Sequence, residues 1–317
     1  MLVQVAEGIY QLSVEFPFGM RQMNSYIFKG EKGLTIVDTG SYSEQSIEIW
    51  KRALPAETKV EKIVLTHSHT DHIGLARWLR EQFQAPVLIS RLGFDEMQKY
   101  HRKLQNYTGS DTALYPFFAR HGGPFVQEKA MLEQVDADYF EPDELLENGQ
   151  EVELGDYVFQ SLWTPGHSPD HFCFYNRSSR ILLAGDHVLN EISPLIPIWS
   201  EEEGNPLRDY LESLEKVAEL PVDVALPGHG SLIYDLQTRI AELRAGHEQR
   251  MQQILEGISR HGNTAGEVSQ AVYRFDNMSF RHLAEFLMTL TRMLYLESEG
   301  KLRAEQREGK IVFRLVG

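Results

Sequence analysis

A run of six residues, H-S-H-T-D-H, brings three imidazoles and one carboxylate into a single short stretch: His67, His69, Asp71 and His72. The run follows the apolar stretch 63–65 and precedes a helical pattern, so we expect it in a loop between a strand and a helix. There His67 and His69 can point to the same side, while Asp71 and His72 converge from the start of the helix. Imidazole nitrogen and carboxylate oxygen are ligands for first-row transition metals, zinc above all, so the run predicts a metal site.

The length of the chain and its apolar content are those of an ordinary globular protein. It has 317 residues, of which 42% are hydrophobic, enough for one large domain or a large domain and a small one. No run approaches the ~18 consecutive apolar residues of a membrane helix, and the N-terminus lacks the pattern of a signal peptide. The single cysteine, Cys173, lies in a strand-like segment, where we expect a core residue and not a catalytic thiol. We therefore expect a cytoplasmic protein without a membrane partner.

The formal net charge of −15 argues against broad electrostatic binding to nucleic acid, which usually leaves a basic footprint. The charge is uneven along the chain. Residues 239–317 carry twelve Lys and Arg and ten Asp and Glu, a balance of +2, whereas the first 238 residues have a balance of −17. The contrast predicts two domains, a catalytic domain over 1–235 and a smaller domain over 236–317.

Strand-like and helix-like segments alternate along the first 90 residues, which favours helices layered on a sheet. We expect strands at 9–14, 25–28, 34–37, 63–65 and 87–89, and helices near 43–53 and 73–83. Strands resume at 152–154, 157–163, 172–175 and 181–184, followed by a helix at 207–220 and a strand at 222–226. Between these two parts, residues 92–146 predict a mostly helical insertion, with helices at 94–105 and 125–135. It lies either over the active site or on the surface as a hairpin.

The C-terminal part predicts three helices and a hairpin. A long helix begins near residue 236, further helices follow at 265–273 and 283–299, and residues 301–316 hold two short strands. This order resembles a winged-helix module.

Three segments downstream of the first run share one pattern, in which a strand ends, a glycine follows and a residue able to bind metal comes next. These residues are His167, Asp186 and His229. The glycine lets the backbone turn sharply, so that the next side chain points across the strand ends. A single segment of this kind would indicate only an ordinary polar loop. Three of them after H-S-H-T-D-H indicate one shared metal centre.

The spacing H-x-H-x-D-H, followed in order by His167, Asp186 and His229, resembles the metallo-β-lactamase superfamily over roughly residues 8–232. The resemblance implies an α+β fold, a four-layer αββα sandwich with a two-metal site between the edges of two mixed sheets. It implies His67, His69 and His167 on one metal, with Asp71, His72 and His229 on the other. Asp186 would bridge both ions, and Asp38 would support the site without binding metal. Two Zn²⁺ are the expected cofactors, with iron or manganese as alternatives.

This ligand set predicts hydrolysis by a hydroxide bound to a dinuclear metal centre. Two divalent ions about 3.5–4 Å apart can share a water and lower its pKa from ~15.7 toward ~7. The hydroxide attacks a carbonyl or phosphoryl centre while a metal stabilises the developing charge. We expect Asp186 and Asp71 to be catalytic, Asp71 with a secondary role in proton transfer to the leaving group.

The other histidines have supporting roles in this prediction. His171 is expected to orient the ligands, with direct ligation as the alternative. His187 is expected to point away from Asp186, with a substrate contact as the alternative. Surface or packing positions are expected for the rest, namely His101, His121, His247, His261 and His282.

The leading functional prediction is a hydrolase of a small ester, thioester or lactone. Glyoxalase II, acyl thioesterases and homoserine-lactone lactonases have this metal set, whereas true β-lactamases of the superfamily lack the bridging carboxylate. A clear basic cluster that would grip glutathione is missing, which argues against glyoxalase II itself. The aromatic residues of the insertion either receive an acyl chain or form the insertion's own core: Tyr100, Tyr107, Tyr115, Phe117, Phe118 and Phe125.

The alternatives are other enzymes of the same superfamily. A C-terminal winged helix and the stretch 246–250 resemble the lactamase-beta-like endoribonucleases, but the acidic balance disfavours RNA. A persulfide dioxygenase with one iron is a minor alternative, and a flavodiiron oxidoreductase would need a flavin domain that the sequence lacks. Three roles are open for the C-terminal module: it binds nucleic acid, it covers the active site, or it forms a homodimer. Its packing positions are Leu287, Leu290, Met293 and Leu294.

Overall fold

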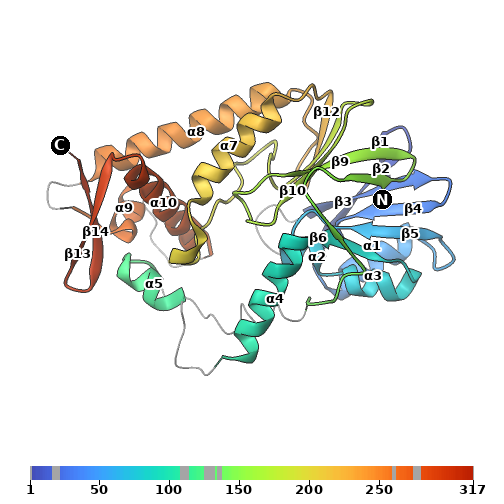
Figure 1. Ribbon diagram of the computed structural model, residues 1–317, viewed down its shortest axis with the longest axis horizontal. Helices are drawn as coiled ribbons and strands as arrows, with labels where there is room; N and C mark the ends of the chain where they lie inside the picture. The colour runs from blue at the N-terminus through green and yellow to red at the C-terminus, as the bar shows by residue number, and fades with distance from the viewer. Residues whose placement is uncertain are drawn as a thin grey trace.

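The computed structural model describes residues 2–15, 22–107, 114–124, 133, 138–258, 262–273 and 280–316 (Figure 1). The N-terminal half forms a seven-stranded sheet in the order β1-β2-β3-β4-β5-β6-β7. Its strands are β1 (Leu2–Ala6), β2 (Ile9–Glu15), β3 (Gln22–Gly30), β4 (Gly33–Val37), β5 (Val60–Val64), β6 (Val87–Ser90) and β7 (Glu144–Leu146). β1 to β4 pair antiparallel and β4 to β7 pair parallel, so the sheet is mixed.

A second, five-stranded sheet has the order β12-β11-β10-β9-β8. Its strands are β8 (Glu151–Leu154), β9 (Tyr157–Trp163), β10 (Phe172–Asn176), β11 (Ile181–Gly185) and β12 (Val224–Pro227). Only β11 and β12 pair parallel, joined by a crossover through helix α7 (Pro206–Ala218). The hairpin β13 (Leu302–Arg307) and β14 (Lys310–Leu315) stands apart from both sheets.

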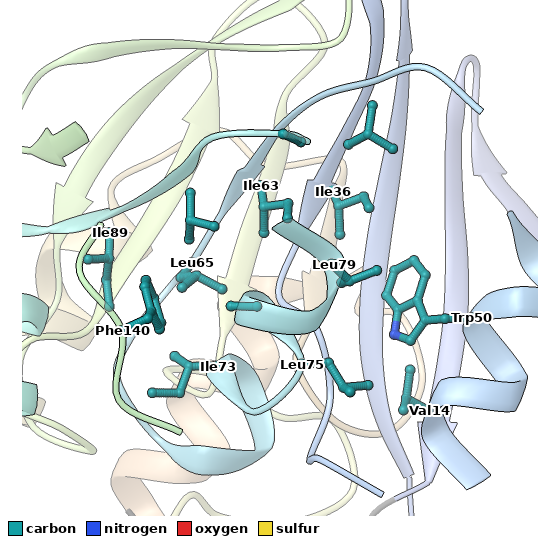
Figure 2. Packing of buried hydrophobic residues seen from close by; sticks show 14 of the residues in the cluster. Val14, Ile36, Trp50, Ile63, Leu65, Ile73, Leu75, Leu79, Ile89 and Phe140 are labelled. Carbon is teal, nitrogen blue, oxygen red and sulfur yellow. The ribbon is translucent and has the colours of Figure 1, made fainter. Parts of the chain in front are cut away.

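Helix α1 (Glu44–Ala53) and helix α3 (Ala76–Phe83) cover the outer face of the first sheet. The side chain of Ser43 caps α1 by accepting a hydrogen bond from the backbone N–H of Ser46. Figure 2 shows Trp50 of α1 and Leu79 of α3 gathered against Ile36 and other strand side chains. These residues are fully buried, and burial of each large apolar side chain contributes about 1.5–3 kcal/mol.

The two sheets pack against each other through a second apolar cluster, which holds Phe28 of β3 and Phe159 of β9 edge to face, 5.5 Å between ring centroids. The outer face of the second sheet is covered by α7 and by α8 (Leu236–Gly257), with Tyr210 and Leu243 buried there. The layers are therefore helix, sheet, sheet and helix. The predicted α+β, αββα fold is confirmed.

Most predicted elements are present, with shifted ends. β1, β7 and α5 (Leu114–Arg120) were not predicted. The predicted helix at 94–105 is α4 (Arg91–Gln105), whereas the helix expected at 125–135 lies almost entirely outside the described residues. Two short helices follow strands: α2 (Thr70–Ile73) comes after β5, and the 3-10 helix η1 (Glu201–Glu203) comes after β11.

The C-terminal part consists of α8, α9 (Ala265–Tyr273), α10 (Phe280–Ser298) and the hairpin β13–β14, in the predicted order. The winged-helix assignment and the boundary at residue 235 stay predictions. The apolar cluster of this part contains Leu287, Leu290 and Met293, fully or almost fully buried, with Leu294 packed against it. These positions therefore pack within the chain.

The insertion also packs on this C-terminal cluster. Phe117 and Phe118 of α5 are buried in it, and the ring of Phe118 meets that of Phe286 edge to face at 5.5 Å. These two residues are core residues, which was one of the two predicted roles, but this core is shared with the C-terminal helices and hairpin and does not belong to the insertion alone. Tyr107 lies in the described part of the chain outside this cluster, Tyr100 is half-buried on α4, and nothing is described for the side chains of Tyr115 and Phe125.

Two composition-based expectations can be compared with the structure. Cys173 is buried in the second sheet, and burial raises the pKa of its thiol to about 12, as expected for a core residue. Across the part of the chain that the structure describes, none of the helices has the length and apolarity that crossing a membrane requires.

The contact between α5 and α9 leaves no room for a side chain at Gly266. Its backbone N–H donates to the carbonyl of His121, and a Cβ atom at this position would lie 1.9 Å from the carbonyl oxygen of Gly122. Replacing Gly266 by Ala is expected to lower the free energy of unfolding by about 1–3 kcal/mol, because α9 must move away from residues 121–122. Urea denaturation followed by circular dichroism measures the change.

Gly246 provides the matched control, because a Cβ there on the exposed side of α8 meets nothing within 4 Å. Gly246→Ala is expected to be neutral or to stabilise by about 0.5–1 kcal/mol, as alanine favours a helix over glycine. Equal effects of the two substitutions would contradict the close approach of α9 and residues 121–122.

Candidate metal centre

All the predicted ligands lie where strands end. His67 and His69 follow β5, and Asp71 and His72 occupy the four-residue helix α2, as the loop-to-helix pattern predicts. His167 follows β9, Asp186 follows β11 and His229 follows β12. The strand ends of the two sheets thus bring seven side chains from four segments of the chain to one place.

The structure divides these side chains into two groups. The nitrogens of His67, His69 and His167 lie within 4.8 Å of one another, and the ring nitrogens of His69 and His167 are 2.9 Å apart. Ligand atoms of the second group, all within 4.8 Å of one another as well, belong to Asp71, His72, Asp186 and His229. The two groups contain the two ligand sets that the family resemblance implies.

Asp186 lies between the two groups. Its Oδ2 is 3.5 Å from Nε2 of His167 in the first group and 3.5 Å from Nε2 of His229 in the second. Its Oδ1 is 3.5 Å from Nε2 of His72. This position lets one carboxylate contact ions on both sides.

In the described part of the chain, some of the predicted ligand atoms lack a hydrogen-bond partner, whose place a metal ion would take. Nε2 of His67, Nε2 of His72 and Oδ1 of Asp186 are buried and have no hydrogen-bond partner among the described residues. Buried polar atoms are rarely left in this state. Imidazole and carboxylate donors in this number fit divalent transition metals, so the residues present fit a metal centre.

The fold orients four of the imidazoles through their Nδ1 atoms. Nδ1 of His167 lies 2.7 Å from the carbonyl oxygen of Leu195, and Nδ1 of His229 lies 2.7 Å from that of Gln22. A carbonyl oxygen only accepts, so each Nδ1 donates and each ring is held with Nε2 turned toward the centre. His67 pairs in the same way with the hydroxyl of Thr66 at 3.0 Å.

Asp38 orients the fourth imidazole. Its Oδ2 is 2.8 Å from Nδ1 of His72 and accepts the hydroxyl proton of Thr66, while its Oδ1 accepts the backbone N–H of Thr66. Asp38 is buried and has a positive φ of 57°, a conformation that few residues other than glycine adopt. Asp38 thus contacts a ligand and lies outside both ligand groups, the supporting position that was predicted.

His171 and His187 lie behind the centre. Nε2 of His171 accepts the backbone N–H of Asp186 at 3.0 Å and its Nδ1 pairs with Thr164, so both nitrogens are used and the predicted supporting role is confirmed. His187 is fully buried, and its ring lies 5.3 Å from that of Tyr210. The alternative of a substrate contact finds no exposed surface on His187.

Of the remaining histidines, His121 and His247 are buried packing residues, and His101 stacks on Tyr139 at 4.2 Å. His282 is half-buried on α10, and His261 lies outside the described residues.

Asp170 is a supporting residue that sequence reasoning missed. It is fully buried, its Oδ2 accepts the backbone N–H of Ser68 at 2.7 Å, and its Oδ1 accepts the hydroxyl proton of Ser168. Ser68 lies between two ligands of the first group, and Ser168 follows the third. One carboxylate therefore ties together the loops that carry all three, and its signal was a charged residue inside P-G-H-S-P-D-H.

Asn24 is the second missed residue. Its side-chain amide donates to the carbonyls of Pro227 and Gly230, and its backbone N–H donates to that of Gly228. The hydroxyl of Tyr26 also donates to the carbonyl of Pro227. Strand β3 of the first sheet thereby holds the turn that carries His229.

Burial and mutual charge set the protonation of the group. Burial raises the pKa of Asp71, but His72 and the hydrogen bond from His229 outweigh it and lower the pKa to about 2. Burial lowers the pKa of His229, but Asp186 and Asp71 raise it to about 9. Burial and then His69 lower the pKa of His167 to about 4, so that this imidazole is neutral near pH 7.

Comparison with known proteins assigns the family. Residues 19–229 match the model of the Metallo-beta-lactamase superfamily, two thirds of the chain. The chain belongs to this superfamily. Together with the two His and Asp groups, membership identifies it as a metal-binding hydrolase.

Similar proteins match most of this chain. The metallo-beta-lactamase family protein TTHA1429 from Thermus thermophilus is 28% identical, with a TM-score of 0.84 over 99% of this chain and 100% of that one. The probable metallo-hydrolase YqjP of Bacillus subtilis is 24% identical over 84% of this chain and 85% of its own. The atrochrysone carboxyl ACP thioesterase of Aspergillus fumigatus is 25% identical over 78% of this chain and 64% of its own.

Replacing Asp170 by Asn tests its role in the site. The amide can still accept from the N–H of Ser68, but its NH₂ group can only donate to the hydroxyl of Ser168, so the charge-assisted hydrogen bond of the carboxylate is lost and the tie between the two loops weakens. Metal affinity is expected to fall about 10-fold or more, the usual cost of losing a residue that orients ligands. Competition with a chromophoric chelator measures it. Asp223→Asn, at an exposed ion pair with Arg180, is the control. Unchanged affinity in Asp170→Asn would refute the role.

Proposed function

We propose that the protein hydrolyses a small ester, thioester or lactone with two metal ions held by these seven side chains. The observation that carries the proposal is the position of Asp186, whose Oδ2 is 3.5 Å from a histidine of each group. Two ions, when bound, supply the Lewis acidity that lowers the pKa of water, gives hydroxide near neutral pH and polarises a carbonyl oxygen. Imidazole-rich sets suit zinc best, with iron or manganese as alternatives.

The protein residues prepare this chemistry before substrate binds. Burial holds the pKa of His67 well below its usual range, with a further contribution from His72, so its lone pair is available at neutral pH. The acceptors on Nδ1 of His167 and His229 fix the rings with Nε2 toward the centre. Such preorganised groups need no rearrangement when charge develops on the substrate oxygen.

Asp71 is the proposed acid–base group. Its Oδ2 lies 3.1 Å from Nε2 of His229, and its low pKa keeps it ionised above about pH 2. An ionised carboxylate beside the reacting atoms can take the proton released from water and pass it to the leaving group. This role is secondary to holding the ion.

Two observations favour an acyl substrate. A relative over 78% of this chain carries the name of a thioesterase. The net charge of −15 gives little attraction for a polyanion, which counts against the alternative of an endoribonuclease. The minor alternative of a persulfide dioxygenase needs one iron. The single, buried cysteine suits a cytoplasmic setting, which is part of the proposal.

Metal analysis of the purified protein tests the centre. About two ions per chain are expected after expression in metal-replete medium, because each group offers three or more ligand atoms. Elemental mass spectrometry gives the ratio. A value near zero would refute the proposal, and one tightly bound iron would favour the dioxygenase.

Replacing Asp186 by Ala tests the shared carboxylate. Turnover is expected to fall at least about 10³-fold, the rate equivalent of losing several kcal/mol of charge stabilisation. Cooperative thermal unfolding should persist, because the side chain lies at the end of β11 and outside the apolar clusters. Asp223→Ala is the control. Activity that survives in Asp186→Ala would show that the bridging role is wrong.

A panel of substrates separates the activities. Acyl thioesters, esters, lactones, glutathione persulfide and single-stranded RNA are compared at equal enzyme concentration, with Asp186→Ala as the blank for each. Turnover of thioesters, esters or lactones is expected. Cleavage of RNA alone would favour the endoribonuclease.

A further inference from the structure

The segment between β11 and α7 joins the catalytic centre to the C-terminal helices. Ile196 is fully buried in the cluster beneath the second sheet, and Ile198 is buried in the C-terminal cluster. Residues 194–199 belong to no helix or strand. Their backbone polar groups therefore need partners from elsewhere in the molecule.

One peptide group of this segment has partners on both sides. The carbonyl oxygen of Leu195 accepts from Nδ1 of His167 at 2.7 Å. The N–H of Ile196, which belongs to the same peptide group, donates to the sulfur of Met288 on α10 at 3.0 Å. A trans peptide group is planar, with its oxygen and its hydrogen on opposite sides. The sulfur and the imidazole therefore hold one rigid plane from its two ends.

Met288 is well placed to fix that plane. It is half-buried and packs against the cluster beneath the second sheet, while its helical neighbours Phe286 and Leu287 are anchored in the C-terminal cluster. Hydrogen bonds that share one peptide group also strengthen each other, since a donating N–H makes its carbonyl a better acceptor. Rotation of the plane would remove the acceptor that orients His167.

We propose that Met288 is a positioning residue for the metal centre, acting through the Leu195–Ile196 peptide group to hold His167 with Nε2 toward the ion. The proposal rests on the proposed function, in which His167 binds metal. It assigns a role in the site to α10, which supplies no ligand itself. Sequence position gives no hint of this role, because Met288 follows His167 by more than a hundred residues.

Two substitutions separate the sulfur from its bulk. Met288→Leu keeps the apolar volume but removes the acceptor, whereas Met288→Gln keeps an acceptor of similar reach. Met293→Leu makes the first change five residues along α10, where the side chain is fully buried in the C-terminal cluster. Thermal unfolding confirms that each variant is folded.

Zinc affinity is measured by competition with a chromophoric chelator, and the Co²⁺ forms are compared by visible absorption. Met288→Leu is expected to lower the affinity for one of the two zinc ions about 10-fold and to alter the absorption spectrum of the Co²⁺ form. Met288→Gln is expected to stay within about threefold of the parent, as is Met293→Leu. With an active acyl substrate, Met288→Leu is expected to lower kcat by a larger factor than it changes KM.

Two results would overturn the proposal. If Met288→Leu and Met293→Leu have the same zinc affinity and the same Co²⁺ spectrum, the sulfur of Met288 does not position His167. Equal losses in Met288→Leu and Met288→Gln would assign the effect to packing alone. A parent protein that binds no zinc gives a different result, since it refutes the proposed function and with it the premise of this role.

Discussion

The packing of the two sheets against each other is the interaction on which the metal centre depends. Neither sheet supplies a complete ligand group: the first contributes the ligands of H-S-H-T-D-H, and the second contributes His167, Asp186 and His229. The apolar layer that contains Phe28 and Phe159 thus sets the distance between the two halves of each ligand group. Any shift between the sheets would therefore pull apart the two halves of both ligand groups at once.

Charge balance explains why such a polar cluster is tolerated in a buried place. Asp71 and Asp186 bring two carboxylates together, and burial alone would favour their neutral forms. The positive forms of His72 and His229 offset them, since burial lowers the pKa of His72 but Asp186 and Asp38 raise it well above its usual value. Divalent ions would supply that positive charge directly. The same carboxylates can therefore stabilise protons in one state and metal in the other.

The sequence predicts the ligands far better than their supports. His67, His69, Asp71 and His72 are found because their spacing is local, and the later ligands because each follows a glycine at a strand end. Two of the acceptors that orient them are the backbone carbonyls of Leu195 and Gln22, which have no side-chain signal. Asp170 and Asn24 act across long separations that only the fold reveals. The packing of Phe118 on Phe286 likewise joins residues far apart in the sequence, a contact that local spacing does not reveal.

The order of the ligands along the chain has a consequence during synthesis. Asp71 and His229 meet in the folded protein but are 158 residues apart in sequence. At translation rates of about 5–20 residues per second, the first four ligands wait roughly 10–30 seconds for the last one. During that interval the group that contains Asp71 and His72 lacks His229. The second ligand group is therefore complete only after β12 has joined β11 and the turn after β12 has brought His229 to the centre.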